Sequence, residues 1–150
     1  MDNKSINRAR LAVGLISGTS MDGIDAALVR LTGAADQPRV RLLAFSTLPY
    51  PSEVRQWIMR VAAGEQTSAQ EVSRLNFLLG QLFAEAALQV CREAHVPPQR
   101  LSVVGSHGQT IYHEGRSEPS LGIKAAVGPN TLQIAEPAVI AERTGAPPLS

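Results

Sequence analysis

Two apolar runs joined by a short loop of small polar residues constrain the fold of this chain most strongly. Residues 11–16 are uninterruptedly apolar, which is typical of a strand buried on both faces, and a second apolar run covers residues 24–31. The sequence between them, SGTSMDG, contains Asp22-Gly23, a dipeptide typical of tight hairpin turns. We therefore predict two neighbouring strands connected by this loop.

A third strand follows in the segment PRVRLLAF, where apolar and charged residues alternate. Val40 and Leu42 are expected on one face of this strand, with Arg39 and Arg41 on the other. The preceding segment, TGAADQP, has the glycine, aspartate and proline of a turn. Three neighbouring strands with short links predict an antiparallel meander.

Two helices are expected after the meander. The first lies between Pro51, which suits a helix start, and Gly64, which suits a helix end. Its apolar residues at helical spacing are Val54, Trp57, Ile58 and Val61. The second carries an amphipathic stripe from Val72 to Val90, preceded by Ser68 and Glu71 at the spacing of a capping box. Pro97 and Pro98 are expected to stop it.

The apolar segment LSVVGS predicts a further strand over residues 101–106, ending in a polar loop. A helix between the meander and this strand makes it parallel to its neighbour, so the chain is assigned to the α/β class. Residues 114–130 are expected to be irregular, TLQIAEP to form a short strand, and EPAVIAER to begin a helix with Pro137 in its first turn. A sheet built this way needs one more strand, which the sequence pattern does not provide.

Composition excludes several classes of protein. The chain has 150 residues, enough for one domain, with 44% hydrophobic and 18% charged residues, as in ordinary globular proteins. A net charge of +1 argues against nucleic acid or an anionic membrane as a partner. The polar start of the chain and the absence of a long apolar run predict a soluble cytoplasmic protein without a membrane anchor. Cys91, the single cysteine, is expected to be a buried thiol.

The first loop has the composition of an anion-binding site. Gly18 and Gly23 allow close backbone approach, and Thr19 and Ser20 add hydroxyl groups, so the loop is suited to phosphates; an ordinary hairpin turn is the alternative. It is neither a Walker loop nor a dinucleotide fingerprint. Its two aspartates, Asp22 and Asp25, suit Mg²⁺ bound through water, or are simply turn and solvent residues.

The second polar segment, GSHGQT, and the later TLQIAEP hold the other candidate ligands. Their side chains suit a polyhydroxylated ligand, or alternatively satisfy local backbone groups and, for Glu136, a helix N-terminus. These residues are Ser106, His107, Gln109, Thr110, His113, Gln133 and Glu136. A Ser/His nucleophile pair is disfavoured because no nucleophile elbow is present, and the histidines lack zinc-binding spacing.

Three stretches together carry a resemblance to a known family. They are GLISGTSMDGIDAALV, GSHGQTIYH and TLQIAEPAVIAERTG, and in this order and spacing they resemble the N-terminal portion of the anhydro-N-acetylmuramic acid kinases, from about Leu11 to Gly145. That family is similar to the sugar kinase/Hsp70/actin superfamily. The resemblance therefore implies an actin-like ATPase domain with a ribonuclease H-like core: a three-strand antiparallel meander, helices, then a parallel strand.

The resemblance implies a reaction and a set of ligands. Water opens 1,6-anhydro-N-acetylmuramic acid and ATP phosphorylates its 6-oxygen, giving N-acetylmuramic acid 6-phosphate in peptidoglycan recycling, with Mg²⁺ as cofactor. The residues matching the family's ATP phosphate loop are Gly18, Thr19, Ser20, Met21, Asp22, Gly23, Ile24 and Asp25, with Asp22 and Asp25 as water-mediated metal ligands. The sugar-side candidates are His107, Gln109, Thr110, Gln133 and Glu136.

The chain departs from the family pattern in several respects. Ile16 stands where many relatives in the superfamily have an aspartate, and Ala135 where family members often have glycine. Family members are longer and carry their catalytic base beyond residue 150, so residues 1–150 are interpreted as an incomplete N-terminal ATPase/sugar-kinase domain with no catalytic base and little activity alone. Full-length relatives are expected to form homodimers. The alternatives are a non-catalytic nucleotide-binding module of the actin/Hsp70-like superfamily and a degenerate product that folds poorly.

Overall fold

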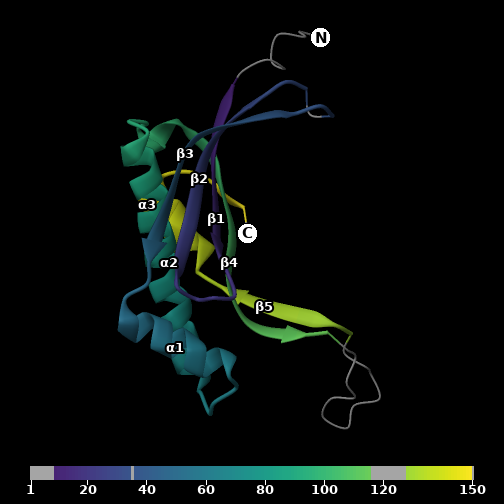
Figure 1. The fold of residues 1–150 in the computed structure, drawn as a ribbon, viewed down its shortest axis with the longest axis vertical. Helices are drawn as coiled ribbons and strands as arrows, with labels where there is room; N and C mark the ends of the chain where they lie inside the picture. The colour runs from purple at the N-terminus through teal and green to yellow at the C-terminus, as the bar shows by residue number, and fades with distance from the viewer. Residues whose placement is uncertain (1–8, 35, 116–127, 150) are drawn as a thin grey trace.

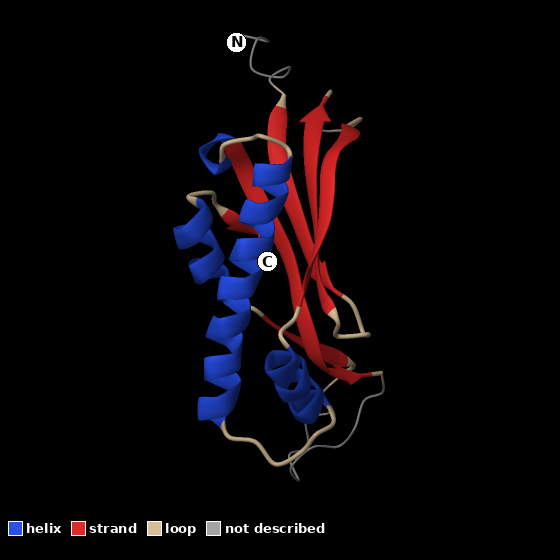
Figure 2. Cartoon of the chain, turned by 60° about the vertical axis from the view of Figure 1, so that its left-hand side comes forward, coloured by secondary structure: helices blue, strands red, loops and turns tan. Residues whose placement is uncertain are grey.

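A mixed β-sheet with helices against one face forms the body of the chain (Figures 1 and 2). This computed structural model describes residues 9–34, 36–115 and 128–149. The strands are β1 (Arg10–Ser17), β2 (Gly23–Thr32), β3 (Arg39–Pro49), β4 (Leu101–Glu114), β5 (Asn130–Ile134) and β6 (Pro148–Leu149). The helices are α1 (Ser52–Ala62), α2 (Ala69–Glu93) and α3 (Pro137–Thr144), with a 3₁₀ turn, η1, at Pro98–Arg100.

The predicted meander and the parallel strand are confirmed. The strand order is β3-β2-β1-β4-β5, with β1 antiparallel to β2, β2 antiparallel to β3, and β1 parallel to β4. The register pairs Gly14 with Ala27 on β2 and with Gly105 on β4. The chain is therefore of the α/β class. The closer comparison with a ribonuclease H-like, actin-like core remains a prediction.

Strand β1 is not buried on both faces as its apolar run predicted. Val13 and Leu15 point into the core, whereas Gly14 is exposed and Ile16 is 47% exposed. The reason is that, among the described residues, α2 and α3 pack on the same side of the sheet (Figure 2). An apolar run alone does not reveal whether a second layer covers the other face.

Helix α2 is the main packing partner of the sheet. Its predicted capping box is present: the Ser68 hydroxyl accepts from the Glu71 amide at 3.2 Å, and the Glu71 carboxylate accepts from the Ser68 amide at 3.0 Å. Leu75, Leu79 and Phe83 are fully buried, as the stripe predicted. The helix ends at Glu93, ahead of the predicted proline stop, and Cys91 is a buried thiol as expected.

The second predicted loop is wrong, because β4 continues through it to Glu114. Gln109 to Glu114 pair with β5 in an antiparallel hairpin that extends away from the body of the sheet (Figure 1). Gly105, Ser106 and Gln109 of the predicted loop pair with β1. Small and polar residues in this segment provide no apolar alternation, which is the pattern that indicates a strand. Most of the predicted irregular segment, residues 116–127, lies outside the described residues.

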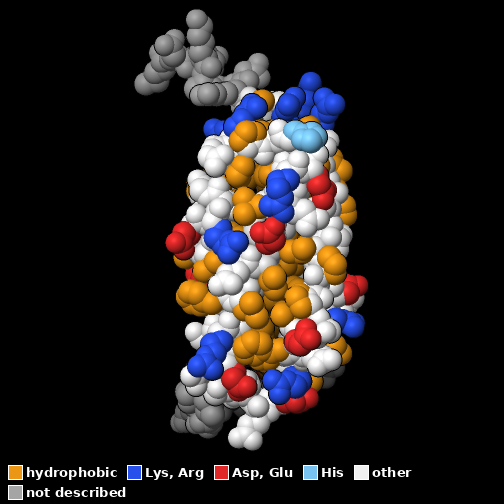
Figure 3. Space-filling view, turned by 90° about the vertical axis from the view of Figure 1, so that its left-hand side faces the viewer, with side chains coloured by type: hydrophobic (Ala, Val, Ile, Leu, Met, Phe, Trp, Pro, Cys, Tyr) orange, Lys and Arg blue, Asp and Glu red, His pale blue; other side chains and the backbone are white. Residues whose placement is uncertain are grey.

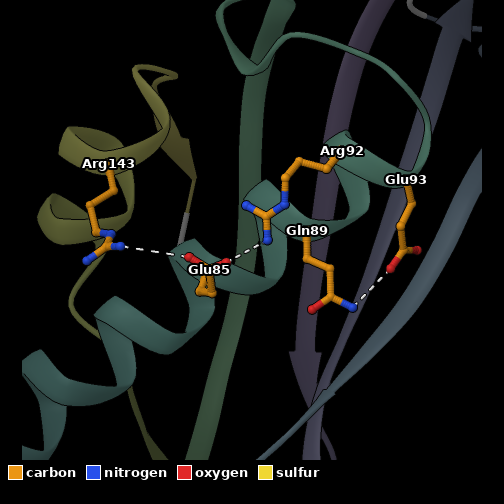
Figure 4. Close-up of polar contacts among 5 residues, drawn as sticks. All are labelled: Glu85, Gln89, Arg92, Glu93 and Arg143. Atoms are coloured by element: carbon orange, nitrogen blue, oxygen red, sulfur yellow. Dashed lines mark hydrogen bonds and ion pairs between the residues drawn. The ribbon is translucent and has the colours of Figure 1, made fainter.

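The sheet contains a short strand, β6, after α3, so the expectation that no strand follows this helix is wrong. Strand β6 follows α3 and pairs in parallel with Val104 and Gly105 of β4. Helix α3 packs along α2, where Glu85 lies 3.8 Å from Arg143 on α3 and 2.6 Å from Arg92 on its own helix (Figure 4). These exposed ion pairs contribute little to stability; the packing of α3 is mainly apolar, through the buried Ile140.

The helix-bearing side of the surface mixes charged and apolar side chains (Figure 3). Apolar side chains gather on its lower half. Exposed apolar residues of the helices include Met59 on α1, 49% exposed, and Phe77 on α2, 50% exposed. Within the described ranges, no helix is long and apolar enough to cross a membrane.

Candidate functional site

The hairpin tip, residues 18–22 between β1 and β2, leaves backbone donors unused. A turn bond joins the Met21 amide to the Gly18 carbonyl at 3.1 Å. The amides of Thr19 and Ser20 make no hydrogen bond to any described residue, and both residues are exposed. Free amides at a tight turn are suited to binding an anion. The hairpin and the phosphate-loop interpretations of the sequence are therefore compatible at this tip.

Arg55 on α1 donates hydrogen bonds to carbonyls of the hairpin tip, a contact that the sequence did not predict. Its guanidinium donates to the Met21 carbonyl at 3.1 Å and to the Ser20 carbonyl at 3.3 Å. The Ser20 hydroxyl donates to Asp22 at 2.8 Å, and this bond, helped by the charge of Arg55, lowers the pKa of Asp22. No local pattern around residue 55 indicated this role, because the two partners are 34 and 35 residues apart in the chain.

The other residues predicted for the tip differ in how deeply they are buried. Gly23 and Ile24 begin β2 and are buried, so the Ile24 side chain packs in the core, away from the surface of the tip. Asp25 is half-buried and accepts from the Thr47 hydroxyl of β3 at 2.6 Å. Asp22 is exposed. The exposed amides of Thr19 and Ser20 are therefore donors available to a ligand at this tip.

A β-bulge in β4 lies beside the end of β1. Leu15 pairs with Ser106 and Ser17 with Gln109, so His107 and Gly108 together oppose the single residue Ile16. Gly108 has a φ of +70°, and a Cβ there would meet the Ile134 carbonyl at 2.9 Å. Only glycine fits this position without strain. The glycine of the SHGQT segment therefore creates the bulge.

A buried polar contact connects the hairpin tip to this bulge. The Ser17 hydroxyl lies 2.6 Å from Gln109 Oε1 and 2.8 Å from the Gly23 carbonyl, and it donates its single proton to one of them. Tyr50 reaches the same region; burial raises its pKa to about 12, against the opposing influence of the Ser17 hydroxyl. The Tyr50 phenol has no hydrogen-bond partner among the described residues.

A pocket of about 270 Å³ lies next to the bulge, where β4, β5, α2 and α3 meet. It is lined by Asn76, Ser106, His107, Gly108, Gln133, Ile134, Ala135, Glu136 and Pro137. Its volume is just below the ~300 Å³ at which pockets for drug-sized ligands begin, which suits a ligand about as large as a monosaccharide. Hydroxyl, imidazole, amide and carboxylate groups are all present in this wall, as recognition of a polyhydroxylated molecule requires.

Three of the five sugar-side candidates line this pocket: His107, Gln133 and Glu136. Gln109 is 1% exposed and is occupied by Ser17 and the Thr110 carbonyl. The Thr110 hydroxyl accepts from Gln133 at 3.5 Å and does not line the pocket. Gln109 and Thr110 thus lie behind the pocket wall. His113 pairs with Thr131 further along the β4–β5 hairpin.

Asn76 is a pocket residue that sequence reasoning missed. The signal was available: Asn76 lies four residues after Val72 and four before Gly80, on the face that α2 turns toward its partners. A polar residue on such a stripe is expected to have a specific partner. Its amide donates to Glu136 Oε2 at 2.9 Å and its Oδ1 accepts from the Ala135 amide at 2.9 Å.

The candidate metal ligands of the tip are its two aspartates, Asp22 and Asp25. Among the described ranges, no group of three or more histidine, cysteine, aspartate or glutamate side chains is placed to hold a metal ion. Asp22 and Asp25 each already accept one hydroxyl hydrogen bond. Each carboxylate keeps free acceptor positions, and carboxylate oxygen is the ligand type that Mg²⁺ prefers.

Comparison with known proteins decides the family of this chain. A family model described as Anhydro-N-acetylmuramic acid kinase matches residues 10–150. The chain belongs to the anhydro-N-acetylmuramic acid kinase family. The resemblance carried by the three sequence motifs is thereby confirmed.

Relatives named anhydro-N-acetylmuramic acid kinase match most of this chain but only part of their own length. The protein from Caldanaerobacter subterraneus subsp. tengcongensis is 48% identical over 136 residues, covering 91% of this chain and 34% of the relative. That from Bacillus thuringiensis subsp. konkukian is 44% identical over 132 residues, covering 88% and 33%. The chain thus spans about a third of the length of the curated relatives it matches.

Similarity to solved structures adds nothing to this assignment. A cryo-EM structure of CasPhi-2 bound to crRNA aligns with a TM-score of 0.23 and 14% identity, covering 79% of this chain and 18% of that protein. A TM-score this low supports no conclusion about fold or function.

Proposed function

We propose that this chain binds the phosphates of ATP at the hairpin tip and 1,6-anhydro-N-acetylmuramic acid in the neighbouring pocket. In the reaction, a base takes a proton from water as the water oxygen adds to the anomeric carbon, and the bond from that carbon to the 6-oxygen breaks. The 6-oxygen attacks the γ-phosphorus, whose bond to the bridging oxygen breaks to release ADP. The products are N-acetylmuramic acid 6-phosphate and ADP, as expected of a cytoplasmic step in peptidoglycan recycling. Family membership supports this proposal.

The observation that carries the proposal is the pair of free amides at Thr19 and Ser20. Phosphoryl transfer depends mainly on positioning and on neutralising negative charge, and backbone donors held in place supply both. The contacts from Arg55 fix the carbonyls of the same turn, so the amides do not need to reorganise when a phosphate arrives. Mg²⁺ bound to the phosphates would add charge neutralisation, with Asp22 and Asp25 holding its water ligands.

The pocket supports the sugar half of the proposal. His107, Gln133 and Glu136 provide donors and acceptors in one wall, and the Ser17–Gln109 contact places this wall beside the tip. We propose that the remaining wall and the catalytic base come from the other two thirds of the family's length. On this view the chain is one part of a ribonuclease H-like, actin-like ATPase domain, and alone it turns over slowly or not at all.

Binding of ATP tests the tip directly. Thr19 is the second residue of the Gly18–Met21 turn, a position that tolerates proline, so Thr19→Pro removes one amide donor while keeping the turn. Titration calorimetry with ATP and Mg²⁺ is expected to show binding about tenfold weaker for Thr19→Pro, as for loss of one charge-assisted hydrogen bond. Thr19→Ala keeps the amide and is the matched control. Equal affinities for Thr19→Pro and Thr19→Ala would overturn the proposed phosphate site.

Sugar binding distinguishes the kinase from the alternative function. Titration of the chain with 1,6-anhydro-N-acetylmuramic acid is expected to perturb the amide resonances of His107 and Gln133 in NMR spectra. Binding of ATP without any response to the sugar would favour the non-catalytic nucleotide-binding module. Release of ADP at the rate of a full-length relative would contradict the proposal that a second wall is required.

A further inference from the structure

Helix α2 supports the segment that carries Glu136 through hydrogen bonds that involve Asn76. Three hydrogen bonds converge on Asn76: its side-chain amide donates to Glu136 Oε2 at 2.9 Å, its Oδ1 accepts from the Ala135 amide at 2.9 Å, and its carbonyl accepts from the Glu136 amide at 3.0 Å. One side chain and its own carbonyl therefore fix both the backbone and the carboxylate of the neighbouring segment.

Gly80, one turn further along α2, lets this segment approach. It is buried, and a Cβ at this position would meet the Glu136 carbonyl at 2.8 Å and the Glu136 amide nitrogen at 3.1 Å. The backbone of Glu136 thus rests directly on the backbone of the helix. Any side chain at position 80 would lift Glu136 away from Asn76.

The carboxylate of Glu136 is held at both oxygens. Oε2 accepts from Asn76, and Oε1 accepts from the Ala138 amide at 3.1 Å as the N-cap of α3. An ionised carboxylate has about four acceptor positions, so two remain for a ligand. Glu136 lines the pocket together with Asn76. A carboxylate fixed in this way accepts from sugar hydroxyls without losing rotamer freedom when the ligand binds.

We propose that Asn76 is a positioning residue that orients the Glu136 carboxylate toward the sugar in the pocket. The absence of a side chain at Gly80 allows the two residues to approach each other. This inference rests on the proposed function, because it assumes that the pocket binds 1,6-anhydro-N-acetylmuramic acid. It assigns Asn76 no contact with the reacting atoms. Its role is to keep one acceptor group in the orientation that the sugar requires.

Asn76→Asp separates this role from simple structural support. The substitution keeps an acceptor for the Ala135 amide but removes the donor to Glu136 and places a second carboxylate beside it. NMR titration with 1,6-anhydro-N-acetylmuramic acid is expected to show affinity about ten- to a hundredfold weaker at pH 7, as for loss of a hydrogen bond to a charged group. As pH is lowered, a proton shared by the two carboxylates replaces the lost donor, so much of the affinity is expected to return.

Gln89→Glu is the matched control, because Gln89 donates to the carboxylate of Glu93 at 3.0 Å on the exposed side of the same helix (Figure 4). This variant makes the same chemical change away from the pocket and is expected to bind sugar as the wild type does. ATP affinity is measured in parallel and is expected to stay unchanged in both variants. Gly80→Ala provides a second test, because it removes the close approach of Glu136 to α2. It is expected to weaken sugar binding and to leave ATP binding unchanged.

The outcomes separate this inference from the proposed function. Absence of sugar binding by the wild type would overturn both. If the wild type binds sugar and Asn76→Asp binds it equally well at pH 7, the positioning role is wrong and the proposed function stands. Equal losses of sugar and ATP affinity in Asn76→Asp would mean that Asn76 supports the fold generally, which also overturns the positioning role.

Discussion

The hairpin tip and the pocket lie side by side but are built in different ways. The tip is mainly local: one five-residue loop between paired strands presents its amides to solvent, and its long-range contact is the pair of hydrogen bonds from Arg55 to its carbonyls. The pocket is assembled from α2, β4, β5 and α3, and its key contacts join Asn76 to Glu136, 60 residues away. The tip therefore depends on one distant residue, Arg55, whereas the assembled pocket depends on every element that contributes to it.

The contact between Ser17 and Gln109 is where the two regions meet. Ser17 is the last residue of β1 before the tip, and Gln109 follows the bulge that shapes the pocket. A substitution at the pocket is therefore expected to affect stability more than an equivalent one at the tip. The following substitutions test that difference.

The largest difference in the free energy of unfolding is expected between alanine substitutions at two glycines. Gly108→Ala forces a side chain into a φ of +70° and against the Ile134 carbonyl at 2.9 Å, so we expect a loss of about 2–4 kcal/mol in the free energy of unfolding. Gly18→Ala at the tip meets only the Ser20 hydroxyl oxygen, at 3.8 Å, and is expected to change this free energy by less than about 0.5 kcal/mol. Urea unfolding measures both. Equal losses would contradict the contrast between the two regions.

Raising the pH tests the buried phenol of Tyr50, which lies in the region of the Ser17–Gln109 contact. The pKa of Tyr50 is raised from 10.0 to about 12 by burial, so its contribution to stability is complete below pH 10 and is lost as pH rises through 12. The free energy of unfolding of the wild type is expected to fall relative to that of Tyr50→Phe by about 2–3 kcal/mol across this window. Tyr112→Phe, which replaces a 53% exposed ring, is the control. A Tyr50→Phe variant that loses stability in parallel with the wild type would contradict the prediction.

Ser17→Ala tests the contact itself. Gln109 and the Gly23 carbonyl would lose a buried donor, and we expect a loss of about 1–3 kcal/mol in the free energy of unfolding. Ser20→Ala removes an exposed hydroxyl of the same type from the tip and is expected to change this free energy by less than about 0.5 kcal/mol. If the two serine variants unfold at the same urea concentration, the tip and the pocket are not joined through Ser17.

The smallest effect is expected on the ionisation of Asp22. The Ser20 hydroxyl is the main cause of its lowered pKa, and the charge of Arg55 is a lesser one. Ser20→Ala is therefore expected to raise the pKa of Asp22 toward its ordinary value, and Arg55→Met to raise it less. NMR titration of the Asp22 carboxyl carbon measures both shifts. A larger shift in Arg55→Met would mean that the charge of Arg55, and not the hydroxyl of Ser20, is the stronger influence on the tip.

The sequence by itself determined the local elements of this protein. The capping box at Ser68 and Glu71, the apolar stripe of α2, the turn at the tip and the start of α3 at Pro137 all depend on residues within one or two turns of each other, and each was predicted. The family was predicted in the same way, because its three motifs are short and continuous.

Only the tertiary structure decided which conformation the SHGQT segment adopts and which residues line the pocket. The segment is read as a loop from its composition, yet it forms a bulged strand because β1 lies on one side of it and β5 on the other. Likewise, Asn76 became a pocket residue only when α2 was packed against the segment of Glu136. Burial and hydrogen bonding between residues far apart in the chain depend on which surfaces meet, and that information is spread over the whole sequence and not held in any one stretch of it.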